Sequence, residues 1–354
     1  MKPYLLLSDI HAHLWSTFDQ KTAEGSARLQ IILDEIQRAA DELQRAGGDM
    51  IVIAGDIFHV RGKIEPSVFN PVARLFQELI NTGFTITAIP GNHDLESRDT
   101  TEIGNAFQSF NSMLGFDAVT TSKVISIDGD GHIAFVPWQS TLGGLRHQVE
   151  GFPLEGRDKV DLVIHAGIDG VIAGMPEHGL SSAEVASWGF KRVFAGHYHN
   201  HKVMEDGKVI SIGATTHQTW GDIGSKAGYL LVYPDRIQYC ASRAPFFVEV
   251  DETTDKDDLF SLVNGNYVRI RGLKLTDDEV KAWRKLLVEE YGARGVIFQV
   301  TREKVSVRAT PVVSKALSLD ASIAAYVDTL GEEDAEAIKA DCQDILTTIR
   351  SVAA

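Results

Sequence analysis

Short apolar runs alternate with segments of helical periodicity through the first two-thirds of the chain. Positions 29–43 carry apolar residues on one helical face, and 72–80 shows the same pattern, so both stretches are predicted to be helices. The strand-like runs occupy 4–8, 50–54, 85–89, 133–136, 160–164, 193–195, 209–212 and 229–233. This alternation predicts a layered α/β (α+β) domain over residues 1–240, with functional residues where the strands end.

The pattern changes near 242–245, and a smaller α+β unit is predicted over residues 245–308. Thr276 and Glu279 have the spacing of a capping box, which predicts that a helix begins there. The strand-like runs of this unit lie at 246–250, 267–271 and 296–300.

A second break at 309–315 contains a proline, and two amphipathic helices are predicted in the segment 316–354. The first carries its apolar residues between positions 319 and 330, and the second between 335 and 349. Such helices can pack on their own domain or dock on another protein, and the sequence leaves both possibilities open.

Carboxylate and imidazole side chains follow the first two strand-like runs. Asp9 and His11 come directly after the first run. Because residues two apart in an extended segment point the same way, these side chains can share one metal ion. Asp56 ends the second run, and its two carboxylate oxygens could bridge two cations. The preceding Gly55 would allow the backbone to turn sharply beside them.

The sequence Gly91-Asn92-His93-Asp94, after the third run, is the most specific single motif. The amide oxygen of Asn92 is a neutral, hard ligand, which suits a site already rich in negative charge. The adjacent imidazole of His93 can face the substrate instead of the metal. The alternative interpretation is a plain turn, since glycine, asparagine and aspartate are common turn residues.

Three more histidines follow later strand-like runs, namely His165, His197 and His199. In a layered α/β domain the loops at these strand ends gather on one edge. The combined set of carboxylates, imidazoles and an amide selects Mn, Fe, Zn or Mg, and the histidines favour a transition metal. Two such ions about 4 Å apart can activate a water molecule and stabilise in-line displacement at phosphorus. The sequence therefore predicts a two-metal phosphoesterase.

Composition and charge restrict the expected location of the protein, its metal ligands and its way of binding partners. The 354 residues are 44% hydrophobic, and no apolar run approaches the roughly 20 residues of a membrane helix. The first apolar run is too short for a signal peptide, so a cytoplasmic protein without membrane contact is expected. Two cysteines against 12 histidines favour nitrogen and oxygen ligation over thiolate sites or disulfides. A net charge of -15 argues against DNA binding through a broad basic surface, unless a partner supplies that surface.

The ordered motifs Asp-x-His, Gly-Asp, Gly-Asn-His-Asp, His and Gly-His-x-His resemble those of the calcineurin-like metallophosphoesterase superfamily over about residues 4–233. The resemblance implies a β-sandwich flanked by helices and a centre that binds two divalent ions. His93 would protonate the leaving oxygen or stabilise the transition state. The resemblance assigns one ion to Asp9, His11, Asp56 and His199, and the other to Asp56, Asn92, His165 and His197.

Within this superfamily, residues 57–60 and the Pro66-Ser67 that follows resemble the SbcD-type DNA repair exonucleases and differ from the protein serine/threonine phosphatases. The resemblance implies a 3′-to-5′ double-strand exonuclease that is also a single-strand endonuclease. Its ions would be Mn²⁺ in the first place, with Mg²⁺, Fe or Zn²⁺ as alternatives. His59 is associated with exonuclease action in that family; the alternative is a histidine that merely packs near the site.

The same resemblance implies partners. Residues 245–308 would cap DNA, and 316–354 would bind the coiled-coil base of an SbcC-like ATPase. The chain would form a homodimer within a heterotetramer, associated with the nucleoid when bound to DNA. Two rival hypotheses are a small-substrate phosphodiesterase or phosphatase with the same metals, and a non-catalytic scaffold for the ATPase dimer. His13 and His201 lie beside ligand motifs and could contact substrate.

Overall fold

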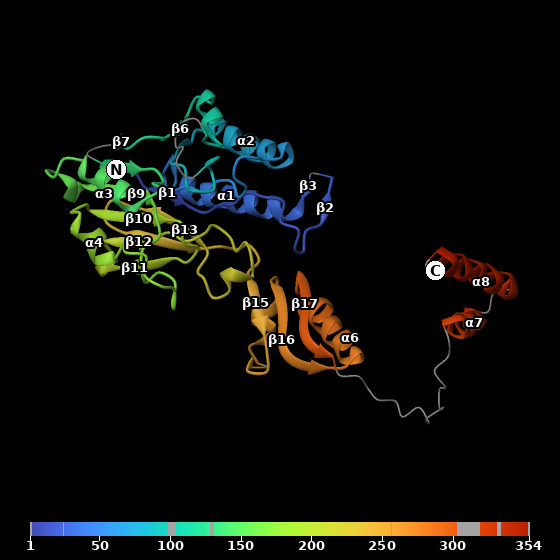
Figure 1. Ribbon diagram of the computed structural model, residues 1–354. Coiled ribbons are helices and arrows are strands. Elements are labelled where there is room, and N and C mark those ends of the chain that lie inside the picture. Colours follow the sequence, from blue (N-terminus) through green and yellow to red (C-terminus); the bar gives the residue numbers. More distant parts are fainter. Residues whose placement is uncertain are drawn as a thin grey trace. The chain divides into compact units, whose positions relative to one another are not determined.

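The computed structural model describes residues 2–23, 25–97, 104–127, 131–255, 257–302, 319–330 and 334–352. Its contacts divide the chain into two compact units, residues 1–302 and 303–354 (Figure 1). All the candidate site residues lie in the first unit. The predicted break at 309–315 lies outside the described residues, and the predicted domain limits 1–240, 245–308 and 316–354 stay predictions.

The helices and strands have the following bounds. The helices are α1 (Ala27–Arg45), α2 (Pro66–Asn81), α3 (Leu142–Glu150), α4 (Ser182–Ser187), α5 (Leu259–Val263), α6 (Asp277–Lys285), α7 (Leu319–Leu330) and α8 (Ala335–Val352). Short 3-10 turns lie at Gln108–Ser112, Arg157–Lys159, Glu205–Gly207 and Trp220–Asp222, and a π-helical turn lies at Leu286–Glu290. The strands are β1 (Tyr4–Leu7), β2 (Lys21–Thr22), β3 (Gly25–Ser26), β4 (Met50–Ile53), β5 (Thr85–Ala88), β6 (Phe116–Ala118), β7 (Lys123–Ile127), β8 (Gly131–Val136), β9 (Val160–His165), β10 (Arg192–Gly196), β11 (Lys202–Met204), β12 (Val209–Ser211), β13 (Gly228–Val232), β14 (Ile237–Ala241), β15 (Phe247–Val250), β16 (Tyr267–Leu275) and β17 (Gly295–Arg302).

Two six-stranded sheets form the centre of the first unit. The first sheet has the order β14-β13-β1-β4-β5-β6, and its strands β1, β4, β5 and β6 run parallel. The second has the order β11-β12-β10-β9-β8-β7, with β8, β9, β10 and β12 parallel. Parallel neighbours end at the same edge of a sheet, so each sheet collects several loops there.

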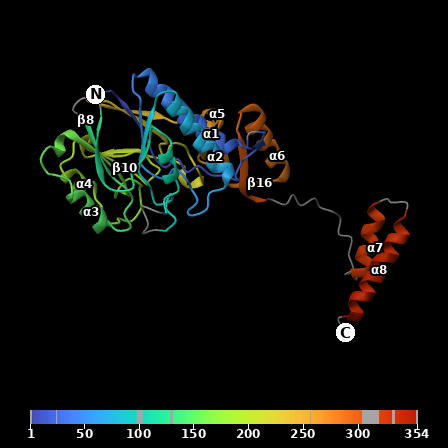
Figure 2. The ribbon, with the colours of Figure 1, turned by 90° about the horizontal axis from the view of Figure 1, so that it is seen from above.

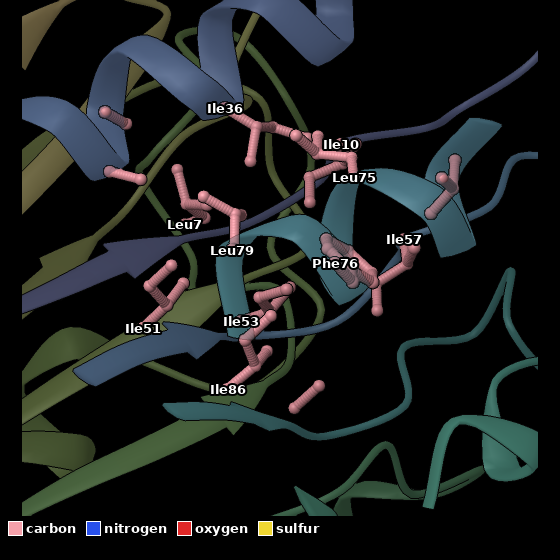
Figure 3. Packing of buried hydrophobic residues seen from close by; sticks show 14 of the residues in the cluster. Leu7, Ile10, Ile36, Ile51, Ile53, Ile57, Leu75, Phe76, Leu79 and Ile86 are labelled. Carbon is pink, nitrogen blue, oxygen red and sulfur yellow. The ribbon is translucent and has the colours of Figure 1, made fainter. Parts of the chain in front are cut away.

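Alternate residues of β1 enter two different cores. Leu7 packs with Ile36 of α1 and Phe76 of α2 (Figure 3). Leu6, on the opposite face, packs with Phe194 of the second sheet. Figure 2 shows α1 and α2 side by side over the first sheet, while the outer face of the second sheet has a core of its own with α3 and α4. The predicted α/β class, a sandwich of two sheets flanked by helices, is confirmed.

Strands β15, β16 and β17 form a separate parallel sheet within the first unit (Figure 1). Residues of α5 and of the π-helical turn pack with its strands in a small core that includes Val263, Ile270 and Leu287. The predicted capping box is present, because Thr276 accepts the backbone N–H of Glu279 and the Glu279 carboxylate accepts the N–H of Thr276. We refer to this sheet and its helices as the cap.

One detail differs from the sequence-based expectation. The helix predicted at 72–80 begins earlier, at Pro66, because a proline in the first turn has no N–H that needs a partner. In the second unit, both predicted terminal helices are present, and Lys339 of α8 pairs with Asp328 of α7 at 2.5 Å. No helix among the described residues is long and apolar enough to cross a membrane.

Candidate metal centre

Strand ends bring the predicted ligands together. Leu7 of β1 is in register with Ile53 of β4, which is in register with Ala88 of β5, so the loops after these strands are neighbours. In the second sheet, His165 closes β9 and lies opposite Gly196, which closes β10. The loops that carry the ligands therefore meet along one edge of the sandwich.

The backbone of the first ligand loop differs from the extended segment that the sequence predicted. Asp9 and His11 have φ of 49° and 48°, and Asp56 has φ of 56°, all in the left-handed region. Backbone hydrogen bonds hold this conformation, since the N–H of Asp9 donates to Gly55 O at 3.0 Å and that of His11 to Asp56 O at 2.9 Å. Strained φ values of this kind persist only where surrounding contacts determine them, and they are concentrated at functional sites.

Gly55 is required on two grounds. Its φ is 96°, which disfavours any residue with a Cβ. A Cβ at this position would also lie 2.3 Å from Nδ1 of His165. The expectation that Gly55 allows a sharp turn beside the ligands is therefore correct, and the close approach of His165 is a second reason.

The ligand atoms form two groups. In the first ligand group, Asp9, His11 and His199, the ligand atoms lie within 4.8 Å of one another, and the same holds for the second ligand group, Asp56, His165 and His197. Asp56 Oδ2 lies between the groups, 3.7 Å from His11 Nε2 and 3.4 Å from His165 Nε2.

Asn92 joins the second ligand group. Its Oδ1 is 3.2 Å from His165 Nε2 and 2.9 Å from His197 Nδ1. All these atoms are oxygen or imidazole nitrogen, so this donor set fits two divalent cations, and its histidine content favours transition metals.

Hydrogen bonds on the far ring nitrogens orient two of the histidines. His165 Nδ1 donates to Ala54 O at 2.7 Å, which leaves Nε2 facing the second ligand group. His199 Nδ1 donates to a carboxylate oxygen of Asp222 at 2.6 Å, which leaves Nε2 as its ligand atom. Partners of this kind fix the tautomer and the ring orientation of metal-binding histidines.

Burial and neighbouring charges shift the pKa values of the candidate ligands in different directions. Burial lowers the pKa of His11 to about 3, although Asp56 acts in the opposite direction. Burial and the nearby His165 lower the pKa of His197 to about 4. Burial would also lower the pKa of His165, but Asp56 outweighs it and raises that pKa to about 9. Burial would raise the pKa of Asp56, but His165 and His11 hold it well below its usual range.

His93 lies beside the ligands in the geometry expected for a group that faces substrate. Its Nδ1 donates to the backbone carbonyl of His59 at 2.6 Å, so Nε2 remains for the substrate. The rings of His59 and His93 stack at 5.2 Å with 15° between their planes. His59 Nδ1 is also 3.3 Å from His11 Nδ1, so His59 contacts both a ligand and the predicted acid.

Asp94 has a role that sequence reasoning did not predict. This buried carboxylate accepts the backbone N–H groups of Asp56 at 2.8 Å, Phe58 at 3.0 Å and Gly91 at 3.0 Å. Burial and the nearby Asp56 raise the pKa of Asp94 to about 7. Asp94 thus ties the loop of Asp56 to the loop of Asn92. Its place in the Gly-Asn-His-Asp motif was the available signal.

A recess of about 340 Å³ adjoins the second ligand group. Trp138 and Tyr198 line it together with His165 and His197. The ring of Trp138 is 5.3 Å from that of His197, and its buried Nε1 has no acceptor among the described residues. Sequence reasoning missed Trp138, although its position after β8 follows the same strand-end rule as the ligands.

The two histidines beside the ligand motifs have different surroundings. The ring of His13 lies 5.1 Å from that of His59, next to the site. His201 instead stacks on Tyr239 at 4.3 Å, and its Nδ1 donates to Ser211 O at 3.0 Å. His201 therefore supports the fold, and only His13 stays close to where a substrate could bind.

The match to a family model agrees with this geometry. Residues 2–201 match the family model of calcineurin-like phosphoesterases, and this range includes every predicted ligand. Among solved structures, a dimetal phosphatase from Danio rerio is similar over 65% of this chain and 92% of that chain, with 12% identity and a TM-score of 0.41. No curated protein matched the sequence. Since the matched range covers more than half of the chain, the protein belongs to the calcineurin-like phosphoesterase family.

Proposed function

We propose that this protein is a metal-dependent DNA nuclease that hydrolyses phosphodiester bonds at a two-metal centre. One observation carries the chemistry: Asp56 Oδ2 lies 3.7 Å from His11 Nε2 and 3.4 Å from His165 Nε2, between the two ligand groups. A carboxylate within reach of both groups is what a bridged pair of cations needs.

The cations would be divided as the family resemblance implies. Mn²⁺ suits this mixture of imidazole and oxygen donors, and Mg²⁺, Fe or Zn²⁺ are alternatives. When bound, the cations would supply an activated water and neutralise charge on the phosphate. One cation would take Asp9, His11, Asp56 and His199, and the other Asp56, Asn92, His165 and His197.

His93 would hand a proton to the departing sugar oxygen. The His59 carbonyl engages Nδ1 of this ring, so the exchanged proton would be carried at Nε2. His59 itself would hold the His93 ring by stacking. Burial and the neighbouring His93 lower the pKa of His59 to about 4, so its own ring is neutral at pH 7.

Half-buried rings beside His59 support a nucleic-acid substrate. Trp15 lies 4.5 Å from His59 and 5.2 Å from His13, measured between ring centroids. Partly exposed aromatic rings next to a phosphate-binding centre can stack on nucleobases without regard to sequence. Together with the SbcD-like segment 57–60, these rings favour DNA over a small phosphomonoester.

The partners in this proposal follow from the same resemblance. The cap would contact DNA, and the terminal helices would bind an SbcC-like coiled-coil ATPase in a heterotetramer that contains two copies of this chain. The ATPase would supply the basic surface that a chain with a net charge of -15 lacks. This proposal places the protein in the cytoplasm, on the nucleoid when bound to DNA.

One observation favours a second candidate, a phosphodiesterase or phosphatase for small substrates. The recess beside His165 and His197 has a volume of about 340 Å³ and is lined by Trp138 and Tyr198. A recess of that size suits a single small ligand rather than a duplex. The acidic net charge agrees with this alternative.

A nuclease assay separates the two candidates. The substrates are blunt duplex and hairpin DNA with Mn²⁺ or Mg²⁺, with and without a coexpressed ATPase, and nucleotide monoesters and cyclic nucleotides are assayed in parallel. We expect Asp56→Ala to abolish cleavage and His93→Ala to slow it by about 10²- to 10⁴-fold, the range for general acid–base catalysis. His147→Ala, on the exposed side of α3, is the matched control.

Full DNA cleavage by both Asp56→Ala and His93→Ala would refute the mechanism. Hydrolysis of small nucleotides with none of duplex DNA, in the presence and absence of the ATPase, would favour the second candidate.

A further inference from the structure

A segment without any predicted ligand lies between the first ligand group and the cap. It comprises residues 215–222, ends in the 3-10 turn Trp220–Asp222, and is called here the connecting segment. Thr215 binds it to the ligand loop, because both its N–H and its hydroxyl donate to Ser8 O, at 3.2 and 3.1 Å. Ser8 directly precedes the ligand Asp9.

Gln218 makes the most direct contact with the ligand loop. Its side chain is buried, with 2% of the residue exposed, and its Nε2 donates to Ile10 O at 3.0 Å. Ile10 stands between Asp9 and His11. The same amide nitrogen also contacts the carbonyl and hydroxyl oxygens of Thr216, at 3.2 and 3.1 Å.

Asp222 extends this contact to the third member of the first ligand group. One carboxylate oxygen accepts Nδ1–H of His199 at 2.6 Å. The other accepts the backbone N–H groups of Gln218 at 2.8 Å and Thr219 at 2.7 Å. Gln218 is therefore linked to Asp9 and His11 through its side chain, and to His199 through its backbone.

The other side of the connecting segment contacts the cap. The N–H of Phe247, the first residue of β15, donates to Nδ1 of His217 at 3.1 Å. His217 Nε2 donates to Ser225 O at 3.0 Å, so this ring is neutral and accepts at Nδ1. The rings of Trp220 and Phe247 also meet edge to face at 4.7 Å.

Arg28 of α1 connects Gln218 itself to the cap. Its Nη2 donates to Gln218 O at 3.0 Å. The guanidinium carbon lies 5.1 Å from the ring of Phe247 and 5.3 Å from that of Tyr267, on β15 and β16. Arg28 is buried, so these cation–π contacts are shielded from water and correspondingly strong.

We propose that Gln218 is a positioning residue that holds the first ligand group in a fixed relation to the cap strands β15 and β16. Displacement of those strands would move Arg28 and Gln218, and with them the Ile10 carbonyl between two ligands. Binding of a substrate by the cap is thereby coupled to cation affinity at the first ligand group.

Among the described contacts, the second ligand group has no direct bond to the connecting segment or to the cap, and its bonds to the first group run through Asp9 and His11. His165 is oriented by Ala54 O, and Asn92 joins His165 to His197. The coupling should therefore be selective for one cation. This inference rests on the ligand assignment in the proposed function.

Mn²⁺ binding to the full chain tests the inference. Calorimetric titration, supported by electron paramagnetic resonance, gives the affinity of each site, and His199→Ala and His165→Ala identify which site is which. Gln218→Met keeps the side-chain length but removes its hydrogen bond to Ile10 O. We expect it to weaken one Mn²⁺ site by about 10- to 100-fold, the range for partners that orient ligands, and to leave the other unchanged.

Two further variants separate positioning from plain stability. Arg28→Met touches no ligand, yet we expect it to weaken the same Mn²⁺ site, and to have little further effect in a Gln218→Met background. Thr216→Val removes one contact of the same buried amide without touching Ile10, so its Mn²⁺ affinities should remain those of the unaltered protein. Saturating Mn²⁺ should restore kcat in Gln218→Met, which a general loss of structure would not allow.

Each outcome decides a different question. The positioning role alone would be overturned if folded Gln218→Met bound Mn²⁺ with unchanged affinities. It would also be overturned if Gln218→Met and Thr216→Val each weakened both Mn²⁺ sites equally. If Gln218→Met does not fold, unchanged affinity in Arg28→Met overturns the coupling. If the unaltered protein binds fewer than two Mn²⁺ ions, or His199→Ala removes none, the ligand assignment fails and the inference with it.

Discussion

Replacing Asp94 by asparagine tests how the two ligand loops are held together. The residue is 1% exposed, and its carboxylate accepts three backbone N–H groups. Two of these bonds, from Asp56 and Gly91, share Oδ2, and the third, from Phe58, reaches Oδ1. An asparagine can place its single carbonyl oxygen toward the first pair, but its NH₂ group then faces the Phe58 N–H.

The magnitude follows from this geometry. One buried donor without an acceptor reduces the free energy of unfolding by about 1–3 kcal/mol, so we expect a loss of that size in Asp94→Asn. Asp94→Ala leaves three such donors, and a loss of roughly 3 kcal/mol or more is a large share of a domain's stability. Because the carboxylate joins the loops of Asp56 and Asn92, both variants should also bind Mn²⁺ more weakly.

Urea denaturation of the metal-free protein measures the first effect, and calorimetric titration with Mn²⁺ the second. Asp34→Asn is the matched control, since Asp34 is exposed on α1 and accepts one hydrogen bond, from Gln30. We expect this control to change the free energy of unfolding by less than about 0.5 kcal/mol. Equal stability of Asp94→Asn and Asp34→Asn would show that the three backbone hydrogen bonds do not hold the loops.

Two further predictions concern Gly55 and His217. Gly55→Ala should displace His165 and weaken Mn²⁺ binding at the second ligand group. The control Gly47→Ala, at φ of 81° with open space around the added Cβ, introduces backbone strain alone. Similar Mn²⁺ affinities in the two variants would refute the steric argument. Burial lowers the pKa of His217 below its usual 6.5, so the unfolded chain binds the proton more readily than the folded one. The stability gained from neutral His217 is then complete above about pH 6.5 and is lost as the pH falls toward the lower folded pKa. Urea denaturation between about pH 7.5 and pH 5 should give a smaller decline for His217→Gln, and parallel declines would contradict this.

The meeting of the candidate ligands at one edge could be predicted from the sequence because it depends on local patterns. Apolar runs such as β1 and β4 predict buried parallel strands, and parallel strands end at a common edge. Asp56 and His165 are placed by that rule alone. A weaker run gave no such signal. β7 lies at the edge of the second sheet and has apolar residues at 124, 125 and 127, none of them fully buried, so it was not predicted.

The backbone conformation at the ligands could not be predicted. Asp9 and His11 are not glycines, and sequence propensity alone disfavours their left-handed φ. The conformation is imposed by hydrogen bonds to Gly55 and Asp56, which lie in the loop after another strand, β4. Tertiary contacts therefore override the local preference, and the extended geometry inferred for this loop was wrong.

The contacts that orient the candidate ligands join residues that are far apart in the sequence. Gln218 is 208 positions from Ile10 and 190 positions from Arg28. No periodicity marks the connecting segment in which Gln218 lies. A substitution at 218 would leave every family motif intact while changing the loop that carries Asp9. If Gln218 acts as we propose, intact motifs establish membership in the family but do not guarantee two occupied cation sites. Metal stoichiometry therefore has to be measured chain by chain within this family.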